Sequence, residues 1–236
     1  MHPVALRPEI VERVLARRGR LHLHASLEAK KTALLVIDMQ NAFVAPGAPI
    51  EVPAARGIVA GINGLAAGLR RLGVPVIWVL HQNAPGGADW RGFFDVFVRP
   101  ENRARAAQAL SPGSELQKQW PELEVDAADL RLAKNRYSAF IGQGSLREVL
   151  AGLGRDTLLI AGTKTNVCCE STARDAMMLD YKVVLLSDCT AALSDEEHRA
   201  SLENVIQQFG DVLTAEEALA LLSSAAPSRP ATLPPA

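Results

Sequence analysis

Four short runs of apolar residues stand out along the chain, and each is followed by polar residues. They cover residues 33–38, 74–80, 157–161 and 182–187, and their content of Val, Leu and Ile predicts strands buried on both faces. Between them lie segments of helical length, at 54–72, 144–153 and 167–179, each closed by Gly, a basic residue or a turn. This alternation predicts an α/β fold with three layers, α/β/α, around a mostly parallel central sheet.

Weaker patterns predict further elements around this framework. They are a strand at 130–134, an edge strand at 211–213, and helices at 8–18 and 215–222. The segment SDEEHRASLENVIQQFG predicts one more helix, with Ser194 as its N-cap and acidic residues in its first turn.

These elements divide the chain into three regions. Residues 1–31 form an N-terminal extension with a short helix, and residues 32–224 form one α/β domain that holds all of the candidate chemistry. The Pro-rich residues 225–236 are predicted to be a disordered tail, because such a composition cannot bury a core.

Reactive side chains follow the predicted strands at their carboxyl ends. Asp38 ends the first strand, His81 follows the second, Lys134 ends the weak strand, and residues 163–168 join a strand to a helix. In a parallel sheet, ligands bind at the carboxyl ends of the strands, where the strand order reverses. The sequence therefore predicts a site at this edge of the sheet.

The composition limits the classes of partner that this site can bind. The formal net charge of the 236 residues is −1, so no basic surface is available to attract nucleic acid, and a small molecule is the expected partner. No stretch reaches the ~18 apolar residues of a membrane span. The chain has three cysteines, Cys168, Cys169 and Cys189, of which two are adjacent. An odd, adjacent set is a poor disulfide framework and favours a cytoplasmic location.

Cys168 has the most informative surroundings. In GTKTNVCCESTARDA, a strand end and a Gly lead into a helix, and Cys168 is expected in the first turn of that helix. The unpaired amides and the dipole there favour a thiolate, which can lower a cysteine pKa from ~8.5 to as little as 3.5–7.5. Taken alone, the pattern fits either a nucleophile or an inert core thiol.

Three blocks together resemble the isochorismatase-like cysteine hydrolases. VIDMQNAF contains Asp38, KNRYSAF begins with Lys134, and the block above contains Cys168; the resemblance covers residues 32–222. It implies an isochorismatase-like fold, and a catalytic triad in which Cys168 is the nucleophile, Asp38 the general base and Lys134 the counter-charge. It also implies a dimer or tetramer and a reaction without a cofactor.

The same resemblance implies how the reacting carbonyl is held. A cis peptide bond between Thr163 and Lys164 and an oxyanion hole formed by the backbone amides of Lys164 and Cys168 are expected. The side chain of Lys164 could point away from the site or reach into it and select an anionic substrate.

Within that family, the blocks around Lys134 and Cys168 resemble the ureidoacrylate-type amidohydrolases most. This resemblance implies hydrolysis of a C–N bond in a small ureido, carbamoyl or amide compound. Nicotinamidase activity and non-catalytic binding of a small molecule on this fold are the alternatives. Expected substrate contacts are Gln40, His81, Gln82, Asn83 and Tyr137.

The histidines give no sign of a metal site. The segment HQNAPGGADW after the second strand contains only His81, and a lone imidazole cannot hold Zn²⁺. His2, His22 and His24 are expected in solvent, and His198 on the polar face of its helix. No metal is predicted.

Overall fold

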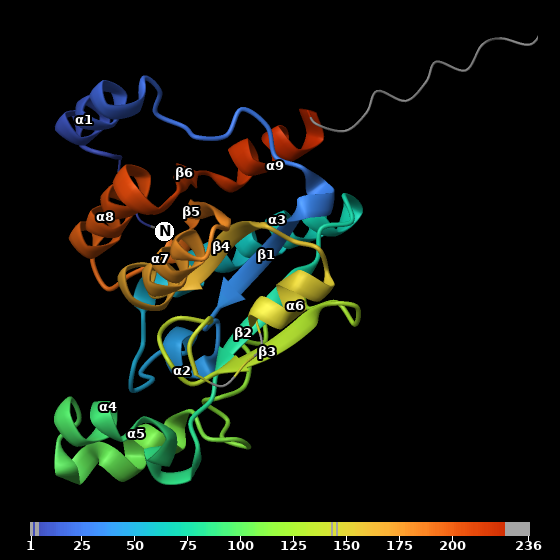
Figure 1. Ribbon diagram of the computed structural model, residues 1–236. Coiled ribbons are helices and arrows are strands. Elements are labelled where there is room, and N and C mark those ends of the chain that lie inside the picture. Colours follow the sequence, from blue (N-terminus) through green and yellow to red (C-terminus); the bar gives the residue numbers. More distant parts are fainter. Residues whose placement is uncertain (1, 3–4, 143, 145, 225–236) are drawn as a thin grey trace, which may run out of the picture.

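A computed structural model describes residues 2, 5–142, 144 and 146–224, and within them a six-stranded sheet forms the centre of the molecule (Figure 1). The strands are β1 (Thr32–Ile37), β2 (Val76–His81), β3 (Leu130–Lys134), β4 (Thr157–Thr163), β5 (Lys182–Ala191) and β6 (Asp211–Leu213). Their order is β3-β2-β1-β4-β5-β6, and every neighbouring pair of these described strands is parallel.

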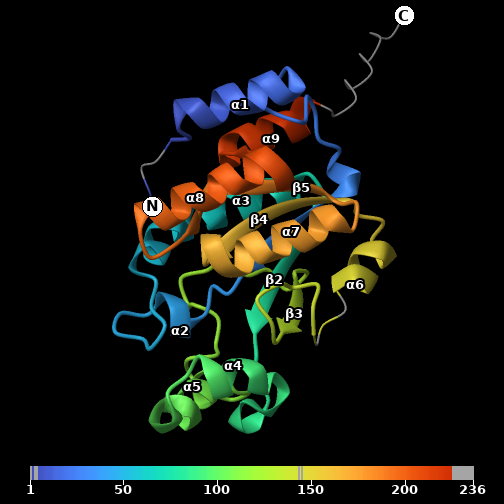
Figure 2. The same ribbon diagram turned by 60° about the vertical axis from the view of Figure 1, so that its left-hand side comes forward.

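Helices cover both faces of the sheet. One face packs against α3 (Val59–Arg71) and α9 (Ala215–Ser224), and the other against α6 (Leu146–Gly152), α7 (Glu170–Met178) and α8 (Asp195–Asn204). Figure 2 shows α7 in front of the strands and α3 behind them. The predicted three-layer α/β/α fold is confirmed.

Alternating side chains of β1 supply both cores. Leu34 and Val36 pack on the α3 side, whereas Leu35 and Ile37 pack on the α7 side, and all four are buried. A strand buried on both faces needs apolar residues at every position, which explains the unbroken run in the sequence. The strand order reverses between β1 and β4, so their carboxyl ends border the crevice where such sheets bind ligands.

Several helices begin or end differently from their sequence patterns. A π-helical turn, Thr165–Cys169, precedes α7, and a 3₁₀ turn, Pro53–Ile58, precedes α3. Helix α8 continues into a second π-helical turn, Val205–Phe209. Ser194 caps α8 as predicted, because its side chain accepts a hydrogen bond from the Glu197 amide.

Three short helices did not emerge from the sequence pattern. They are α2 (Asn41–Val44), α4 (Arg91–Val96) and α5 (Arg103–Ala109). Both views place α4 and α5 away from the layered body, beyond the carboxyl ends of the strands (Figures 1 and 2). Residues 85–110, which contain these two helices, are called the cap below.

The N-terminal extension packs against the domain. Helix α1 (Pro8–Arg18) places Ile10 and Val14 in the core on the α7 side. The expectation that His2 is in solvent is wrong, because its ring stacks on His198 at 4.5 Å and its Nδ1 lies 2.6 Å from Asp195 Oδ1. His198, which was expected on the polar face of its helix, is itself fully buried.

The predicted disordered tail, residues 225–236, lies outside the described residues. No helix among the described residues is long and apolar enough to cross a bilayer.

Candidate active site

The close approach of two strand ends fixes the position of Asp38. Its amide donates to Val79 O at 2.9 Å, and its carbonyl accepts from Thr163 Oγ1 at 2.9 Å. A Cβ atom at Gly162 would lie 2.0 Å from Ile37 O, so only glycine lets β4 come this close to β1. Asp38 therefore leaves the end of β1 beside the turn that follows β4.

Lys134 comes from the end of β3 and forms a buried ion pair with Asp38. Its Nζ lies 2.8 Å from Asp38 Oδ2, and neither side chain is exposed to solvent. The same ammonium donates to Arg136 O at 3.0 Å and lies 3.2 Å from His81 Nδ1. The ammonium also interacts with the thiol of Cys168, so its three N–H donors are surrounded by four partners. The cation is thereby held in one orientation.

Cys168 lies in the π-helical turn, next to this pair. Its thiol interacts with the side chains of both Asp38 and Lys134. The second carboxylate oxygen, Asp38 Oδ1, is buried and lacks an N–H or O–H donor among the described residues. That oxygen is free to accept the thiol proton.

The surroundings of Cys168 favour its thiol form over the thiolate. Burial, followed by the negative charge of Asp38, raises the pKa of Cys168 to about 12, and Lys134 opposes the shift. The prediction of a lowered pKa is wrong, because Cys168 is only 4% exposed and has a carboxylate as its neighbour.

The two charged partners have shifted pKa values as well. Burial raises the pKa of Asp38, although the positive charge of Lys134 acts against it. Burial alone would lower the pKa of Lys134, but the charges of Asp38 and Cys168 outweigh it and the pKa is raised. The ammonium therefore remains charged, and the carboxylate has an increased affinity for a proton.

His81 is held as a neutral ring behind Lys134. Its Nδ1 faces the ammonium, and its Nε2 lies 3.0 Å from Asn83 Oδ1, so this network assigns the ring proton to Nε2. Burial and the charge of Lys134 lower the pKa of His81 well below its ordinary value. Among the described residues, no three His, Cys, Asp or Glu side chains form a group suited to a metal ion.

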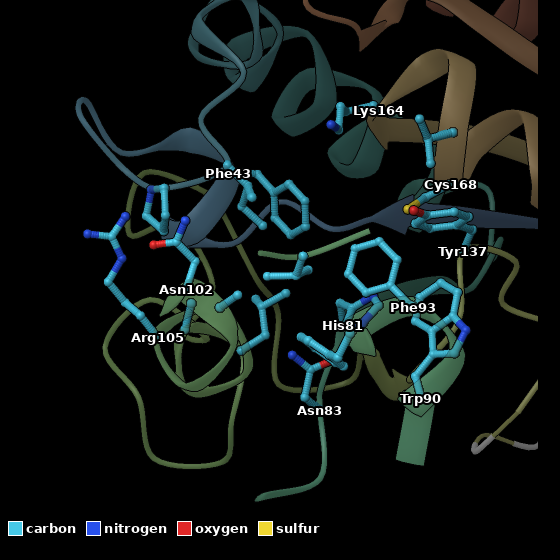
Figure 3. A pocket seen from close by; sticks show the side chains of 18 residues that line it. Phe43, His81, Asn83, Trp90, Phe93, Asn102, Arg105, Tyr137, Lys164 and Cys168 are labelled. Atoms are coloured by element: carbon cyan, nitrogen blue, oxygen red, sulfur yellow. Dashed lines mark hydrogen bonds between the residues drawn. The ribbon is translucent and has the colours of Figure 1, made fainter. Parts of the chain in front are cut away.

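A cavity of about 350 Å³ opens in front of the thiol. Its walls come from the layered body and from the cap, and many of them are aromatic (Figure 3). Trp90 and Phe93 stack at a centroid distance of 4.9 Å, and Tyr137 meets Trp90 edge-on, also at 4.9 Å. Cys168 is thus reached through a pocket with apolar walls.

The structure brings together most, but not all, of the predicted site residues. His81, Asn83 and Tyr137 line the cavity, as does the side chain of Lys164. Gln40 and Gln82 do not line it, which corrects their expected role as substrate contacts. The side chain of Gln40 is buried and hydrogen-bonds backbone groups of His81 and Gln117 instead.

Hydrogen bonds explain the position of both glutamines. The Gln40 side chain accepts from the His81 amide at 2.8 Å and donates to the His81 carbonyl at 3.0 Å, so it supports β2 rather than a ligand. The backbone of Gln82 donates to Lys134 O at 2.8 Å and extends the pairing of β2 with β3.

The turn between β4 and α7 presents backbone groups to the cavity. The Thr163–Lys164 peptide bond is cis. The amides of Val167 and Cys169 both donate to Lys164 O, at 3.1 and 3.2 Å. Those two amides are therefore already engaged within the turn.

Sequence reasoning missed the part of the pocket that the cap supplies. Trp90, Phe93, Asn102 and Arg105 all line the cavity. The usable signal was the aromatic cluster WRGFFDVF, which is too apolar for an ordinary exposed loop.

The chain is similar to known proteins over most of its length. A family model described as the isochorismatase domain matches residues 32–217. Ureidoacrylate amidohydrolase RutB from Methylobacterium radiotolerans is 32% identical over 222 residues, which are 85% of this chain and 84% of the relative. RutB from Variovorax paradoxus is 32% identical over 232 residues, 91% of this chain and 88% of the relative.

Solved structures agree with the sequence relatives. A cysteine hydrolase from Pseudomonas syringae pv. phaseolicola superposes with a TM-score of 0.79 at 29% identity, covering 87% of this chain and 98% of that one. N-carbamoylsarcosine amidase from Thermoplasma acidophilum superposes with a TM-score of 0.64 at 27% identity, covering 79% and 97%.

Proposed function

The chain belongs to the isochorismatase family of hydrolases, and from that premise we propose that it is a cysteine-dependent amidohydrolase cleaving a C–N bond of a small ureido or carbamoyl compound. The observation that carries the proposal is the meeting of Cys168 with the buried Lys134–Asp38 pair at the inner end of the cavity. A thiol, a proton acceptor and a fixed cation are the groups that acyl transfer needs.

In the first half of the reaction, Asp38 takes the thiol proton as sulfur attacks the carbonyl carbon. Burial and the charge of Asp38 raise the pKa of Cys168, so attack needs a base that removes the thiol proton. The ammonium of Lys134 stabilises the negative charge that passes between sulfur and carboxylate. Asp38 then gives the proton to nitrogen, the C–N bond breaks, and ammonia or an amine leaves.

In the second half, water attacks the acyl group on Cys168. Asp38 accepts a proton from that water, and the proton returns to sulfur as the C–S bond breaks. We assign the oxyanion hole to the amides of Lys164 and Cys168, because the neighbouring amides of Val167 and Cys169 already donate to Lys164 O.

The ureido part of the proposal rests on the relatives and on the polar wall. RutB proteins are named as ureidoacrylate amidohydrolases, and a further structural neighbour is named as an N-carbamoylsarcosine amidase. His81, Asn83 and Tyr137 line the cavity near the reacting groups and offer donors and acceptors to a planar urea. A site that pairs such groups rejects compounds that leave its buried polar atoms without partners.

A substrate panel tests this proposal. Ureido acids, other carbamoyl compounds, nicotinamide and simple aliphatic amides are incubated with the enzyme, and released ammonia is measured together with release of the amine. We expect the ureido or carbamoyl compounds to have the highest kcat/KM. Faster turnover of nicotinamide or a plain amide than of every ureido compound would refute the substrate assignment but leave the cysteine mechanism intact.

Hydrolysis is expected to be indifferent to chelators. Both ring nitrogens of His81 already have partners, Lys134 and Asn83, so the ring has no free lone pair for a metal. The check is kcat after dialysis against EDTA, with metal content measured by mass spectrometry. A stoichiometric metal whose removal stops turnover, and whose return restores it, contradicts this expectation.

A further inference from the structure

We propose that the preferred substrate is a ureido or carbamoyl acid with an aromatic or similarly bulky apolar group between the scissile C–N bond and a remote carboxylate, which Arg105 binds. This inference rests on the proposed function and specifies its substrate class. Three features of the cavity support it: the arrangement of its two ends, its charge and its size.

The reacting groups and Arg105 lie at opposite ends of the cavity. Figure 3 shows Cys168 and Tyr137 at one end, Asn102 and Arg105 at the other, and the rings of Phe43 and Phe93 between them. Phe43 comes from α2 of the layered body, whereas the other ring comes from the cap. A ligand that reaches both ends must pass these rings, and an apolar segment is what such walls favour.

The charge of the lining predicts an anion at the far end. Among the 18 described residues that line the cavity, Lys164 and Arg105 are cationic and none is acidic. Within the part of the chain that the structure describes, Arg105 has no ion-pair partner, whereas its neighbour Arg103 is paired with Asp95 at 3.1 Å. A guanidinium with free donors is suited to bind a carboxylate through two parallel hydrogen bonds.

The size of the cavity excludes a very short substrate as its best fit. A volume of about 350 Å³ lies within the roughly 300–1,000 Å³ of pockets that take drug-sized ligands. A urea group, with only four non-hydrogen atoms, is much smaller than the ligands that such pockets hold. The remaining space, bounded by Phe43 and Phe93, accommodates a ring that places a carboxylate near Arg105.

Binding to the Cys168→Ala protein tests the inference without turnover. Calorimetry compares 4-(ureidomethyl)benzoate with benzylurea, which differ only in the carboxylate, and with the short acid 3-ureidopropionate. We expect the benzoate to bind about tenfold more tightly than benzylurea. Arg105→Gln should remove this advantage and leave benzylurea and the short acid unchanged. Arg99→Gln is the matched control, because it removes the same charge from an exposed cap residue that does not line the cavity.

Three results would overturn the inference. They are equal binding of the benzoate and benzylurea, equal effects of the Arg105 and Arg99 substitutions, and loss of the advantage with Lys164→Gln but not with Arg105→Gln.

A parallel pair of plain amides, 4-carbamoylbenzoate and benzamide, separates this inference from the proposed function. A carboxylate preference that appears with the amides alone supports the anion site and refutes the ureido assignment. Hydrolysis of ureido compounds without a carboxylate preference refutes the anion site and supports the ureido assignment.

Discussion

Cys168→Ala is expected to lower kcat by roughly 10⁴–10⁶-fold, because no covalent intermediate can form without the sulfur. The fold should persist, since the substitution removes one buried atom and leaves the Lys134–Asp38 pair and its hydrogen bonds in place. Steady-state kinetics measure the loss, and thermal unfolding reports whether the variant remains folded.

Cys169→Ala is the matched control for that experiment. The two thiols are adjacent and both are buried, but only Cys168 lines the cavity. The control should lose stability by a small amount and keep its kcat. If the two variants lose activity equally, or if the Cys168 variant stays active, the nucleophile has been misassigned.

Asp38→Asn is expected to lower kcat by about 10²–10⁴-fold, the usual loss when a general acid–base group is removed. The same substitution should make the thiol of Cys168 more reactive toward alkylation, although it slows turnover. The negative charge of Asp38 helps to raise the pKa of Cys168, so a neutral amide leaves the positive charge of Lys134 unopposed and the thiol pKa falls. Iodoacetamide should therefore alkylate Cys168 faster in this variant than in the parent enzyme at the same pH.

Lys134→Met should slow both turnover and alkylation of the thiol, unlike Asp38→Asn. Loss of the cation leaves the buried carboxylate of Asp38 unpaired, which costs about 3–5 kcal/mol of folding free energy in comparable cases. Without that cation, the pKa of the thiol rises further, so alkylation and turnover should both slow. Slower alkylation in the Asp38→Asn protein, or normal turnover in either variant, contradicts the assigned roles.

Much of the fold was predictable because burial on both faces leaves a clear trace in the sequence. The runs that became β1, β4 and β5 each contain at least four consecutive apolar residues. The trace of β3 was weak for a physical reason: this edge strand is largely exposed, and of its residues only Lys134 is buried. The candidate residues at the strand ends followed from that topology, since parallel strands deliver their carboxyl ends to one edge.

The cap could not be predicted in the same way. Helices α4 and α5 have only 6 and 7 residues, too few to establish a helical period. The turn before α4 depends on Gly86 and Gly87 in left-handed conformations, with φ of 69° and 72°, which a sequence does not reveal. The far end of the cavity, including Arg105, was therefore unknown until the structure placed it.

The sign of the Cys168 pKa shift was wrong for a related reason. The sequence showed a cysteine at the start of a helix, where the dipole favours a thiolate. It did not show that a π-helical turn buries the sulfur beside a carboxylate, and those two effects dominate. We therefore propose that Asp38, and not the helix dipole, activates the thiol.

The covalent intermediate is the most direct test of the account. The enzyme is mixed with its best substrate, quenched in acid within one turnover, digested, and analysed by mass spectrometry. We expect an acyl group on the peptide that contains Cys168, present before steady state, removed by hydrolysis and absent from the Cys168→Ala protein. Turnover at full rate with no adduct on that peptide, or an adduct on Cys169 or Cys189 instead, would contradict it.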